Sequence, residues 1–479
     1  MNRSIRFGTD GWRGLIADDF TFERVRLVAA SLADQLIAGG AEGKTVVVGW
    51  DRRFLSEDFA KAVSEVLAGA GFTVNLSRDF VPTPAVSLAV RDGKAAAGVM
   101  ITASHNPGRW NGFKVKEPFG GSASPETTAA LEKLVAARLA EPGRIPRMSF
   151  EEATRRGKIE RVELGDAYRA RLAQLVDLKA IAKSGFRVVV DPIHGAGTGT
   201  LARLLEEAGV EVAEIRREFN PLFGGVNPEP IDENLGALRR AMRAVAGGDQ
   251  PVVGLATDGD ADRIGAMDED LAFFDSHRIF TSIFKHLLEV RRLPGSVVQT
   301  FSSTVMIRRL AKKHGVTRIE TPIGFKHVAD HMLKGGVMMG GEESGGLGFS
   351  FHLPERDGAL SGLLLLEACA YAGLPPRALL EKTFAEVGTW EYDRVDLHLD
   401  PGRTAEIVQT VKTMTPPEIA GAKVAERQTL DGIKYLFADD SWLLLRPSGT
   451  EPVLRIYSEA PTRARVKELL DAGRALAGA

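Results

Sequence analysis

The chain has 479 residues, a hydrophobic content of 44% and a formal net charge of -2. This length predicts several domains, and this charge gives no electrostatic reason to expect nucleic acid or a membrane as a partner. The single cysteine, Cys369, excludes an internal disulfide and a zinc site made of thiolates. Because the N-terminal residues lack the apolar core of a signal peptide, we expect a cytoplasmic protein.

The chain opens with a glycine-dense loop at residues 7–14, followed by a helical pattern over about residues 21–38. The glycines allow the backbone to come close to a ligand. The planar guanidinium of Arg13 is able to bind a phosphate through two parallel hydrogen bonds. A tight structural turn explains this stretch equally well.

Three segments then share one pattern: a β-branched strand, a loop, a helix and a second strand that begins after a glycine. Their first strands are residues 46–49, 188–191 and 297–300. Each copy is a βαβ unit, which implies a parallel sheet with right-handed crossovers. The repeat is too long for a solenoid. The sequence therefore predicts three related α/β domains with mixed, largely parallel sheets.

Each copy continues into a further apolar strand that ends in a loop with chemically active side chains. These loops are residues 102–107 with Ser104, residues 258–263 with three aspartates, and residues 340–346 with Glu342. Ligands bind α/β sheets at the carboxyl ends of strands, so equivalent strand ends in three related domains predict one shared cleft. For the first loop alone, a turn in which Ser104 hydrogen-bonds its own backbone is an equally good explanation.

Beyond about residue 388 the pattern changes, and prolines interrupt a segment that predicts a smaller C-terminal α+β domain. In this segment a strand at 442–445 leads into a loop at 446–452, followed by a strand at 453–457 and a helix. We expect four domains with boundaries at 1–148, 149–270, 271–387 and 388–479.

The aspartate loop concentrates Asp258, Asp260 and Asp262 within a short stretch. Their mutual repulsion requires a cation, and a hard divalent ion with oxygen ligands is the natural one. An EF-hand is excluded because Arg263 stands where that loop needs glycine, and because a strand precedes it. The carboxylates leave room for a phosphate oxygen and favour Mg²⁺, with Arg263 placed to hold a phosphoryl oxygen. A solvated acidic turn is the alternative.

Other side chains are candidates for holding a phosphorylated sugar. Glu342 and Ser344 lie between glycines. A carboxylate there is able to accept hydrogen bonds from two neighbouring sugar hydroxyls. A loop that leads into a helix explains this stretch equally well. Lys114 either returns to the Ser104 loop or lies on the surface of a hairpin. In the fourth domain one cation and two hydroxyls form a set of donors suited to a terminal phosphate: Arg446, Ser448, Gly449 and Thr450.

In this order, the loops at 102–107, 258–263, 340–346 and 446–452 resemble the four active-site segments of the α-D-phosphohexomutases. Residues 7–14 resemble the start of the same family. The resemblance covers essentially the whole chain. It implies four domains around a central cleft, a phosphoserine at Ser104, and one Mg²⁺ per chain. The implied metal ligands are Ser104, Asp258, Asp260 and Asp262.

The resemblance also assigns roles around the substrate. It implies that Glu342 and Ser344 hold the sugar and that Lys114 is a candidate general acid or base. The implied ligands of the phosphate that is not reacting are Arg446, Ser448, Gly449 and Thr450. The residues expected at the reaction centre are Arg13, His105, Lys114 and Arg263.

The expected activity is that of a phosphoglucomutase, which interconverts α-D-glucose 1-phosphate and glucose 6-phosphate with glucose 1,6-bisphosphate as intermediate and activator. Glu343 stands where the dual phosphomannomutase/phosphoglucomutase type usually has methionine, and Gly346 where it has histidine. Residues 321–326, which end at Lys326, also resemble the phosphoglucomutase form. These features favour glucose and do not exclude mannose.

The alternatives are the dual mutase, a phosphatase that hydrolyses its phosphoserine, and a non-catalytic sensor of sugar phosphates. We expect hexose phosphates as the binding partners, no nucleic acid and no membrane, and a monomer or a homodimer.

Overall fold

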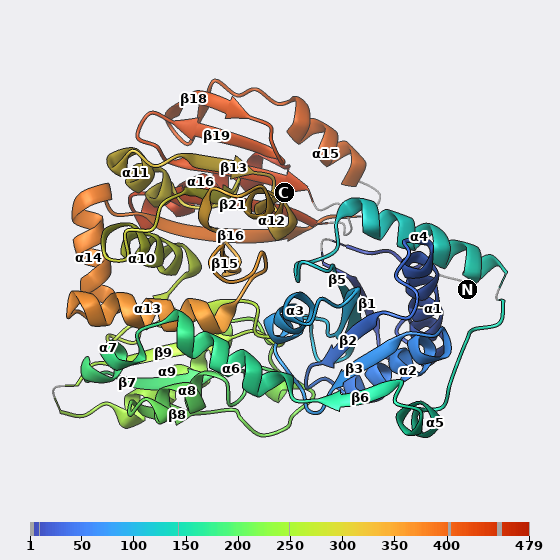
Figure 1. Cartoon of the computed structure of the whole chain (residues 1–479). Coiled ribbons are helices and arrows are strands. Elements are labelled where there is room, and N and C mark those ends of the chain that lie inside the picture. The colour runs from blue at the N-terminus through green and yellow to red at the C-terminus, as the bar shows by residue number, and fades with distance from the viewer. Residues whose placement is uncertain are drawn as a thin grey trace.

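The structure is a computed structural model that describes residues 4–8, 10–141, 143–248, 250–400, 404–447 and 453–478. Four β-sheets define four domains, which we number in chain order (Figure 1). The first domain is blue in this view, the second green, the third mainly yellow to orange, and the fourth mainly orange to red. The predicted Ser448, Gly449 and Thr450 lie outside the described residues.

The sheet of the first domain has the strand order β1-β5-β4-β2-β3-β6. Its parallel centre is the predicted βαβ unit. Consecutive valines of β2 enter different cores, since Val46 and Val48 pack on one face and Val47 on the other. The strands are β1 (Trp12–Leu15), β2 (Thr45–Trp50), β3 (Thr73–Ser77), β4 (Ala97–Ile101), β5 (Trp110–Lys116) and β6 (Ile159–Val162). The helices are α1 (Phe22–Ala38), α2 (Ser56–Gly69), α3 (Thr83–Asp92), α4 (Pro125–Ala140) and α5 (Phe150–Arg155).

The second domain repeats this arrangement with the strand order β11-β10-β9-β7-β8. Its strands are β7 (Arg187–Asp191), β8 (Glu211–Glu214), β9 (Val252–Thr257), β10 (Ile264–Met267) and β11 (Phe273–Phe274). The helices are α6 (Leu164–Leu175), α7 (Leu178–Lys183), α8 (Leu201–Glu207) and α9 (Gly236–Val245), with short 3₁₀ turns η1 (Phe223–Gly225) and η2 (Asp232–Asn234). As in the first domain, the central strands β8, β7 and β9 are parallel.

The third domain has the strand order β13-β12-β14-β15. Its strands are β12 (Ser296–Thr300), β13 (Arg318–Thr321), β14 (Val337–Gly341) and β15 (Leu347–Phe349). The helices are α10 (Ser276–Glu289), α11 (Val305–His314), α12 (Phe325–Lys334), α13 (Gly358–Ala372) and α14 (Pro376–Val387). No single helix among the described residues is long and apolar enough to cross a membrane; only α13 and α14 together, joined at a 77° bend, reach that length and composition. The five leucines of α13 are buried in the protein core.

The fourth domain is built on an antiparallel sheet of order β16-β21-β20-β19-β18-β17. Its strands are β16 (Glu391–His398), β17 (Glu418–Ile419), β18 (Ala422–Gln428), β19 (Ile433–Phe437), β20 (Trp442–Pro447) and β21 (Val453–Ala460). The helices are α15 (Thr404–Thr413) and α16 (Arg463–Leu476). The predicted fold class, three α/β domains with mixed sheets and a smaller C-terminal α+β domain, is confirmed. The domain boundaries stay predictions, and β6 extends the first sheet beyond residue 148.

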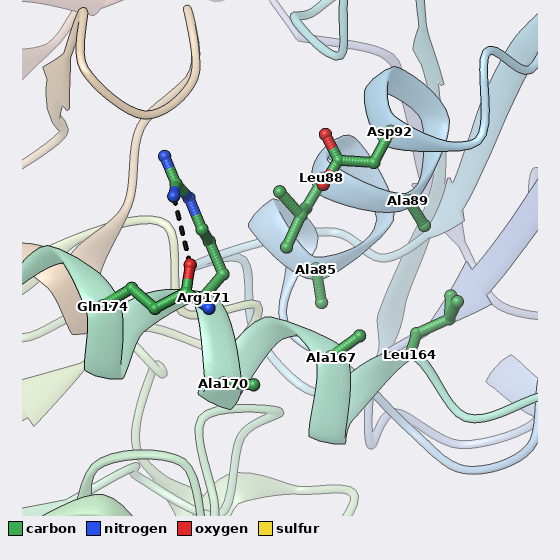
Figure 2. Close-up of a pocket in the computed structure, with 9 residues that line it drawn as sticks. All are labelled: Ala85, Leu88, Ala89, Asp92, Leu164, Ala167, Ala170, Arg171 and Gln174. Carbon is green, nitrogen blue, oxygen red and sulfur yellow. Dashed lines mark hydrogen bonds between the residues drawn. The ribbon is translucent and has the colours of Figure 1, made fainter.

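The domains pack through continuous apolar contacts. One core cluster runs from the first domain through the second and third to Trp442, Leu444 and Tyr457 of the fourth. At the seam of the first two domains, α3 and α6 leave a groove of about 250 Å³ lined largely by alanines and leucines (Figure 2). The guanidinium of Arg171 at this groove donates to Gln174 and to the Phe351 carbonyl. Asp92, the other charged residue at the groove, pairs with Arg91 at 2.8 Å, so both charges at the groove already have partners.

The same chain reversal places one loop at the end of a central strand in each of the first three domains. β4 turns into antiparallel β5, β9 into β10, and β14 into β15. The three turns are the Ser104, aspartate and Glu342 loops that the sequence singled out. The sequence predicted the strands that precede these loops, and the structure adds the antiparallel strands that follow them.

Candidate active site

Ser104 lies in the turn between β4 and β5, and its backbone has φ = +53°, which is uncommon for a residue with a side chain. The residue is only 1% exposed. Its Oγ donates a 2.9 Å hydrogen bond to Oδ2 of Asp258 in the second domain. The structure therefore brings together the Ser104 loop and the aspartate loop, which the sequence predicted to share one cleft.

The aspartate loop wraps around Asp258. Oδ1 of this residue accepts the backbone N–H groups of Asp262 and Arg263, both at 3.0 Å. Ligand atoms of Asp258, Asp260 and Asp262 all lie within 4.8 Å of one another, and all three residues are fully buried. Burial, together with the neighbouring carboxylates of Asp262 and Asp260, raises the pKa of Asp258 well above its usual range.

Two carboxylate oxygens in this cluster indicate that a cation fits there. Asp260 Oδ1 and Asp262 Oδ1 are buried and accept no hydrogen bond from the described residues. A buried carboxylate oxygen without a partner is costly, and oxygen atoms are the ligands that Mg²⁺ prefers. The donor set therefore suits a hard divalent ion.

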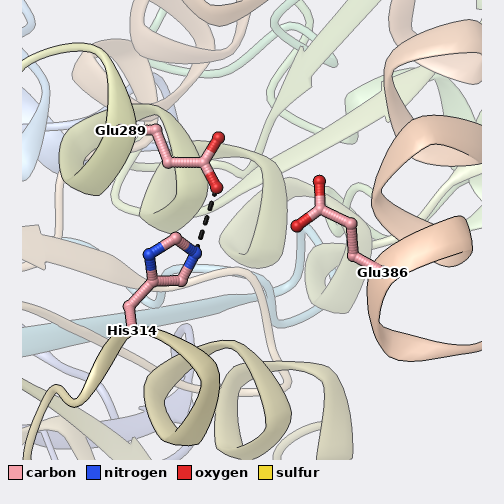
Figure 3. A group of neighbouring side chains, drawn as sticks. All are labelled: Glu289, His314 and Glu386. Carbon is pink, nitrogen blue, oxygen red and sulfur yellow. Dashed lines mark ion pairs between the residues drawn. The ribbon is translucent and has the colours of Figure 1, made fainter.

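A second acidic group provides a contrast. Glu289, His314 and Glu386 lie together on the surface (Figure 3). Here lysines neutralise the carboxylates, because Lys285 Nζ lies 2.6 Å from Glu289 and 2.5 Å from Glu386, and Lys313 pairs with Glu386. These contacts explain the cluster as a network of surface ion pairs.

Lys114 on β5 is 1% exposed, so the interpretation as a surface lysine is wrong. Its Nζ lies 2.6 Å from Asp10 Oδ2, 2.8 Å from Asp260 Oδ2 and 3.1 Å from Asp262 Oδ2. Burial disfavours the charge, but the three carboxylates outweigh burial and raise the pKa of Lys114 above its ordinary value. The same contacts hold the pKa of Asp260 below its ordinary value although burial opposes them.

Arg356, from the segment between β15 and α13, joins three domains at this point. Its Nη2 donates to the carboxylate of Asp10 and lies 2.8 Å from Asp262 Oδ2. Its Nη1 lies 4.0 Å from Glu342 Oε2. The guanidinium thus lies between the aspartate loop and the loop expected to hold the sugar. Sequence reasoning assigned no role to Arg356, which directly precedes the N-cap of α13.

The Glu342 loop packs against the strand that follows the aspartates. The N–H of Ile264 donates to the carbonyl of Gly345 at 3.1 Å. Burial raises the pKa of Glu342 to about 7, although the Arg356 guanidinium lowers it. Ser344 and Lys326 are half-buried, with Lys326 in the first turn of α12.

The remaining predicted residues of the reaction centre surround Ser104. Arg13 donates to the side-chain oxygen of Asn106 in the same loop. His105 Nδ1 lies 3.4 Å from Ser104 Oγ. Burial and the cations Arg263 and Arg13 hold the pKa of His105 well below its usual range, so the imidazole is neutral at pH 7. Arg263 lies 3.4 Å from a carboxylate oxygen of Glu229.

Arg446, at the end of β20, belongs to the junction of the third and fourth domains. Its Nε donates a 2.9 Å hydrogen bond to Asp431, whose other oxygen accepts the N–H of Ile323 at 2.9 Å. Ile323 lies within the predicted segment 321–326, so Arg446 connects through Asp431 to the loop that precedes Lys326.

Comparison with known proteins agrees with this arrangement. Four models described as phosphoglucomutase/phosphomannomutase match in order: α/β/α domain I at residues 4–141, domain II at 166–271, domain III at 275–387, and the C-terminal domain at 406–475. The chain belongs to this family, the α-D-phosphohexomutases.

Relatives of this phosphohexomutase match over nearly their full length. A phosphoglucomutase/phosphomannomutase of Thermococcus kodakarensis is 32% identical over 98% of this chain and 97% of its own. A probable phosphoglucosamine mutase of Methanosphaera stadtmanae is 31% identical, with 97% and 96% covered. A crystal structure from Thermus thermophilus that carries the name phosphomannomutase has 38% identity and a TM-score of 0.86, and covers 100% of both chains.

Membership shows the reaction class: the chain is an intramolecular phosphotransferase of the isomerase type that acts on hexose phosphates. The names of the relatives divide among glucose, mannose and glucosamine. A more distant member of the fold, the N-acetylphosphoglucosamine mutase of Aspergillus fumigatus, was solved with GlcNAc-6P and magnesium; it is 16% identical, with a TM-score of 0.58, and the match covers 99% of this chain and 96% of that one. The buried carboxylates of Asp258, Asp260 and Asp262 fit a site for a hard divalent ion such as the magnesium of that structure.

Proposed function

We propose that this phosphohexomutase is a phosphoglucomutase that interconverts α-D-glucose 1-phosphate and glucose 6-phosphate through a phosphoserine at Ser104. The observation that carries the proposal is the 2.9 Å hydrogen bond between Ser104 Oγ and Asp258, made across two domains inside a buried acidic cluster. A hydroxyl held in this way is placed to exchange a phosphoryl group, and it has no comparable use in a non-catalytic sensor.

The reaction takes place in two transfers. A hydroxyl oxygen of the sugar phosphate attacks the phosphorus on Ser104, the bond from phosphorus to Oγ breaks, and glucose 1,6-bisphosphate forms. After the bisphosphate has been turned end over end in the site, Ser104 Oγ attacks its other phosphate. The bond between that phosphorus and the sugar oxygen breaks, the phosphoserine is restored, and the isomeric hexose phosphate leaves. Lys114 is an ammonium whose proton is held by three carboxylates, so it is suited to donate hydrogen bonds to phosphoryl oxygens. His105 is neutral and 3.4 Å from Ser104 Oγ, so it is suited to accept one.

The metal site would be formed by Asp258, Asp260, Asp262 and the oxygen of Ser104. When bound there, Mg²⁺ supplies neutralisation of the charge that develops on the transferring phosphoryl group. Support for this assignment comes from the Oδ1 atoms of Asp260 and Asp262, which have no partner in the described part of the chain. Arg263, whose backbone N–H is fixed by Asp258, would hold a phosphoryl oxygen beside this centre.

The sugar would be bound between the third and fourth domains. Glu342 and Ser344 would hold the 3- and 4-hydroxyls, a pair that roughly exchanges places when a hexose is turned end over end. Lys326 would bind the substrate beside them. The residues proposed for the phosphate that is not reacting are Arg446, Ser448, Gly449 and Thr450.

Glucose is the proposed sugar because of two residues in the Glu342 loop. Glu343 and Gly346 depart from the dual phosphomannomutase/phosphoglucomutase type, which has methionine and histidine there. The dual activity is the second candidate, favoured by the name of the Thermococcus relative; the Thermus structure carries the name phosphomannomutase.

The test is a side-by-side assay of glucose, mannose, glucosamine and galactose 1-phosphates, with inorganic phosphate release measured in each reaction. We expect glucose to be the best substrate and mannose, altered only at C2, to be usable but poorer. Galactose 1-phosphate should be worse still, because a site built to bond a hydroxyl penalises its misplacement. A preference for mannose or glucosamine overturns the choice of sugar, and phosphate release in place of isomer formation identifies a phosphatase.

A further inference from the structure

We propose that Arg53, together with Asp51, is the positioning residue that fixes the reactive conformation of Ser104. The inference rests on the proposed phosphoserine and adds the means by which its oxygen is aimed. Arg53 follows β2, a strand that pairs with β4, and is 2% exposed. It touches neither the expected sugar site nor the aspartate carboxylates through its hydrogen bonds, all of which involve the first domain.

The guanidinium of Arg53 uses all five of its N–H groups, the maximum that an arginine offers. One goes to a carboxylate and four go to backbone carbonyls of the Ser104 loop and the start of β5. The acceptors are Asp51 Oδ2 at 3.0 Å from Nε, the carbonyls of Pro107 and Trp110 at 2.9 and 3.0 Å from Nη1, and those of Ser104 and Asn106 at 2.6 and 2.7 Å from Nη2. The guanidinium of Arg53 therefore fixes the backbone along the whole Ser104 loop, and not only at a single atom.

Asp51 anchors the other side of the same residue. Its Oδ2, which accepts from Arg53 Nε, also accepts the hydroxyl of Thr102 at 2.7 Å. That hydroxyl oxygen in turn accepts the N–H of Ser104 at 2.9 Å. Arg53 thus holds the carbonyl of Ser104, and Thr102 holds its N–H. Both Arg53 and Thr102 are themselves hydrogen-bonded to the carboxylate of Asp51.

This double support explains how Ser104 keeps φ = +53°. For a residue with a Cβ the left-handed region costs about 1–2 kcal/mol and persists only when the surroundings fix it. The same backbone conformation directs Oγ toward Asp258. The opposing residue of the second domain is Gly259, where a Cβ would lie 2.3 Å from the Ser104 carbonyl oxygen. Small changes in the loop would therefore change the approach of Ser104 to the aspartates.

Arg53 also connects the loop to the domain that carries the aspartates. Its guanidinium carbon lies 4.8 Å from the ring centroid of Phe223, a residue of the second domain. Arg53 therefore packs against the second domain while shaping a loop of the first. Its neighbour Arg52 crosses the same seam, but it donates to Thr198 at 2.7 Å and to the Arg217 carbonyl at 2.9 Å.

The test compares Arg53→Lys with the matched control Arg52→Lys in single turnovers. Each full-length enzyme is phosphorylated with glucose 1,6-bisphosphate, mixed with glucose 1-phosphate and Mg²⁺, and followed by the loss of phosphate from Ser104. Lysine keeps the charge of Arg53 but not its five fixed donors. We expect the maximal transfer rate of Arg53→Lys to fall about 100-fold, since misplacement by about 1 Å has this effect. The half-saturating substrate concentration should change less than about threefold, as for an interaction outside the binding site.

Arg52→Lys should retain the transfer rate within about threefold, although it loses contacts at the same seam. Thr102→Val removes the other support without changing the size of the side chain, and we expect it also to lower the transfer rate and not the substrate affinity. If Arg53→Lys does not fold, the transfer rate of Thr102→Val tests the positioning role in its place. A purely structural role would lower the melting temperature while leaving the transfer rate per phosphorylated molecule intact.

The two proposals fail in different ways. If the wild-type enzyme carries phosphate on Ser104 but Arg53→Lys or Thr102→Val leaves the transfer rate unchanged, the positioning role alone is overturned. A wild-type enzyme that never carries phosphate on Ser104 overturns the proposed function, and the positioning role with it.

Discussion

We predict that the buried carboxyl of Glu342 makes the folded protein less stable as the pH rises, and that replacing this carboxyl removes the loss of stability together with mutase activity. This residue is 6% exposed, and burial raises the pKa of its carboxyl to about 7 in the folded protein, despite the nearby Arg356 guanidinium. In an unfolded chain the pKa of glutamate is about 4.3. Because the folded state binds the proton more tightly, its contribution to stability is complete below about pH 4.3 and is lost as the pH rises through about 7.

The size of this loss follows from the two pKa values. A difference of about 2.7 corresponds to roughly 3.7 kcal/mol in total, of which about 2.5 kcal/mol falls between pH 5 and pH 8. Glu342→Gln keeps the shape of the side chain and removes its titration. If the whole chain unfolds as one unit, its unfolding entropy is about 1 kcal/mol per degree. The melting temperature of the variant, relative to wild type, should then rise by about 2.5 °C between pH 5 and pH 8.

The measurement is differential scanning calorimetry of the metal-free proteins in chelator, since a bound cation nearby would lower the pKa of Glu342. Titration of Asp258 occurs in both proteins and cancels in the difference. Glu343→Gln is the matched control because it removes the adjacent, half-buried carboxyl, which accepts a hydrogen bond from Thr300. A difference between Glu342→Gln and wild type that stays constant or falls with rising pH would refute the reasoning. The same variant should lose mutase activity at pH 8, and full activity would remove Glu342 from the sugar site.

Three further predictions concern the transfer centre and the distant phosphate. Ser104→Ala should carry no phosphate by intact mass and should lose nearly all mutase activity; because Ser104 is buried and bonded to Asp258, we also expect a loss of about 1–2 kcal/mol in unfolding free energy. Asp260→Asn should weaken Mg²⁺ binding at least about tenfold by calorimetry, and a wild-type enzyme indifferent to chelator would contradict the metal site. Arg446→Ala should raise the half-saturating substrate concentration and lower the turnover rate, each by about tenfold or more, so unchanged kinetics would exclude the fourth domain from the site.

Most of the fold could be predicted because the central strands are short apolar runs bounded by glycine and polar loops. The runs at 46–49, 188–191 and 297–300 became β2, β7 and β12, and each lies between two parallel strands. The antiparallel strands after the site loops were harder to predict. β10 and β15 have only four and three residues, too few for a periodic pattern to stand out.

Within the site, prediction succeeded where chemistry is concentrated in one loop and failed where it depends on how domains pack. The aspartate cluster is visible within one short loop of the sequence. Arg356 and Asp10 form an ion pair although they lie 346 positions apart. Asp10 lies in the glycine-dense loop that the sequence singled out, but Arg356 has no local pattern that marks a site. Lys114 was ambiguous for the same reason: its alternation on β5 is that of an ordinary strand, and the neighbouring domain supplies two of its carboxylates.

Lys114 and the proposed metal site use different oxygens of the same two carboxylates, those of Asp260 and Asp262. Lys114 contacts the Oδ2 atoms of both Asp260 and Asp262, whereas the Oδ1 atoms of the same two carboxylates are buried with no partner among the described residues. One oxygen of each carboxylate is therefore engaged by a resident cation, and the other is left for an added one. Because a carboxylate that binds two cations holds each less tightly, an ion at the Oδ1 atoms would weaken the hold on Lys114. The ammonium would then be available to phosphoryl oxygens beside Ser104, so we expect loading of the metal and release of the lysine to be coupled through the same two side chains.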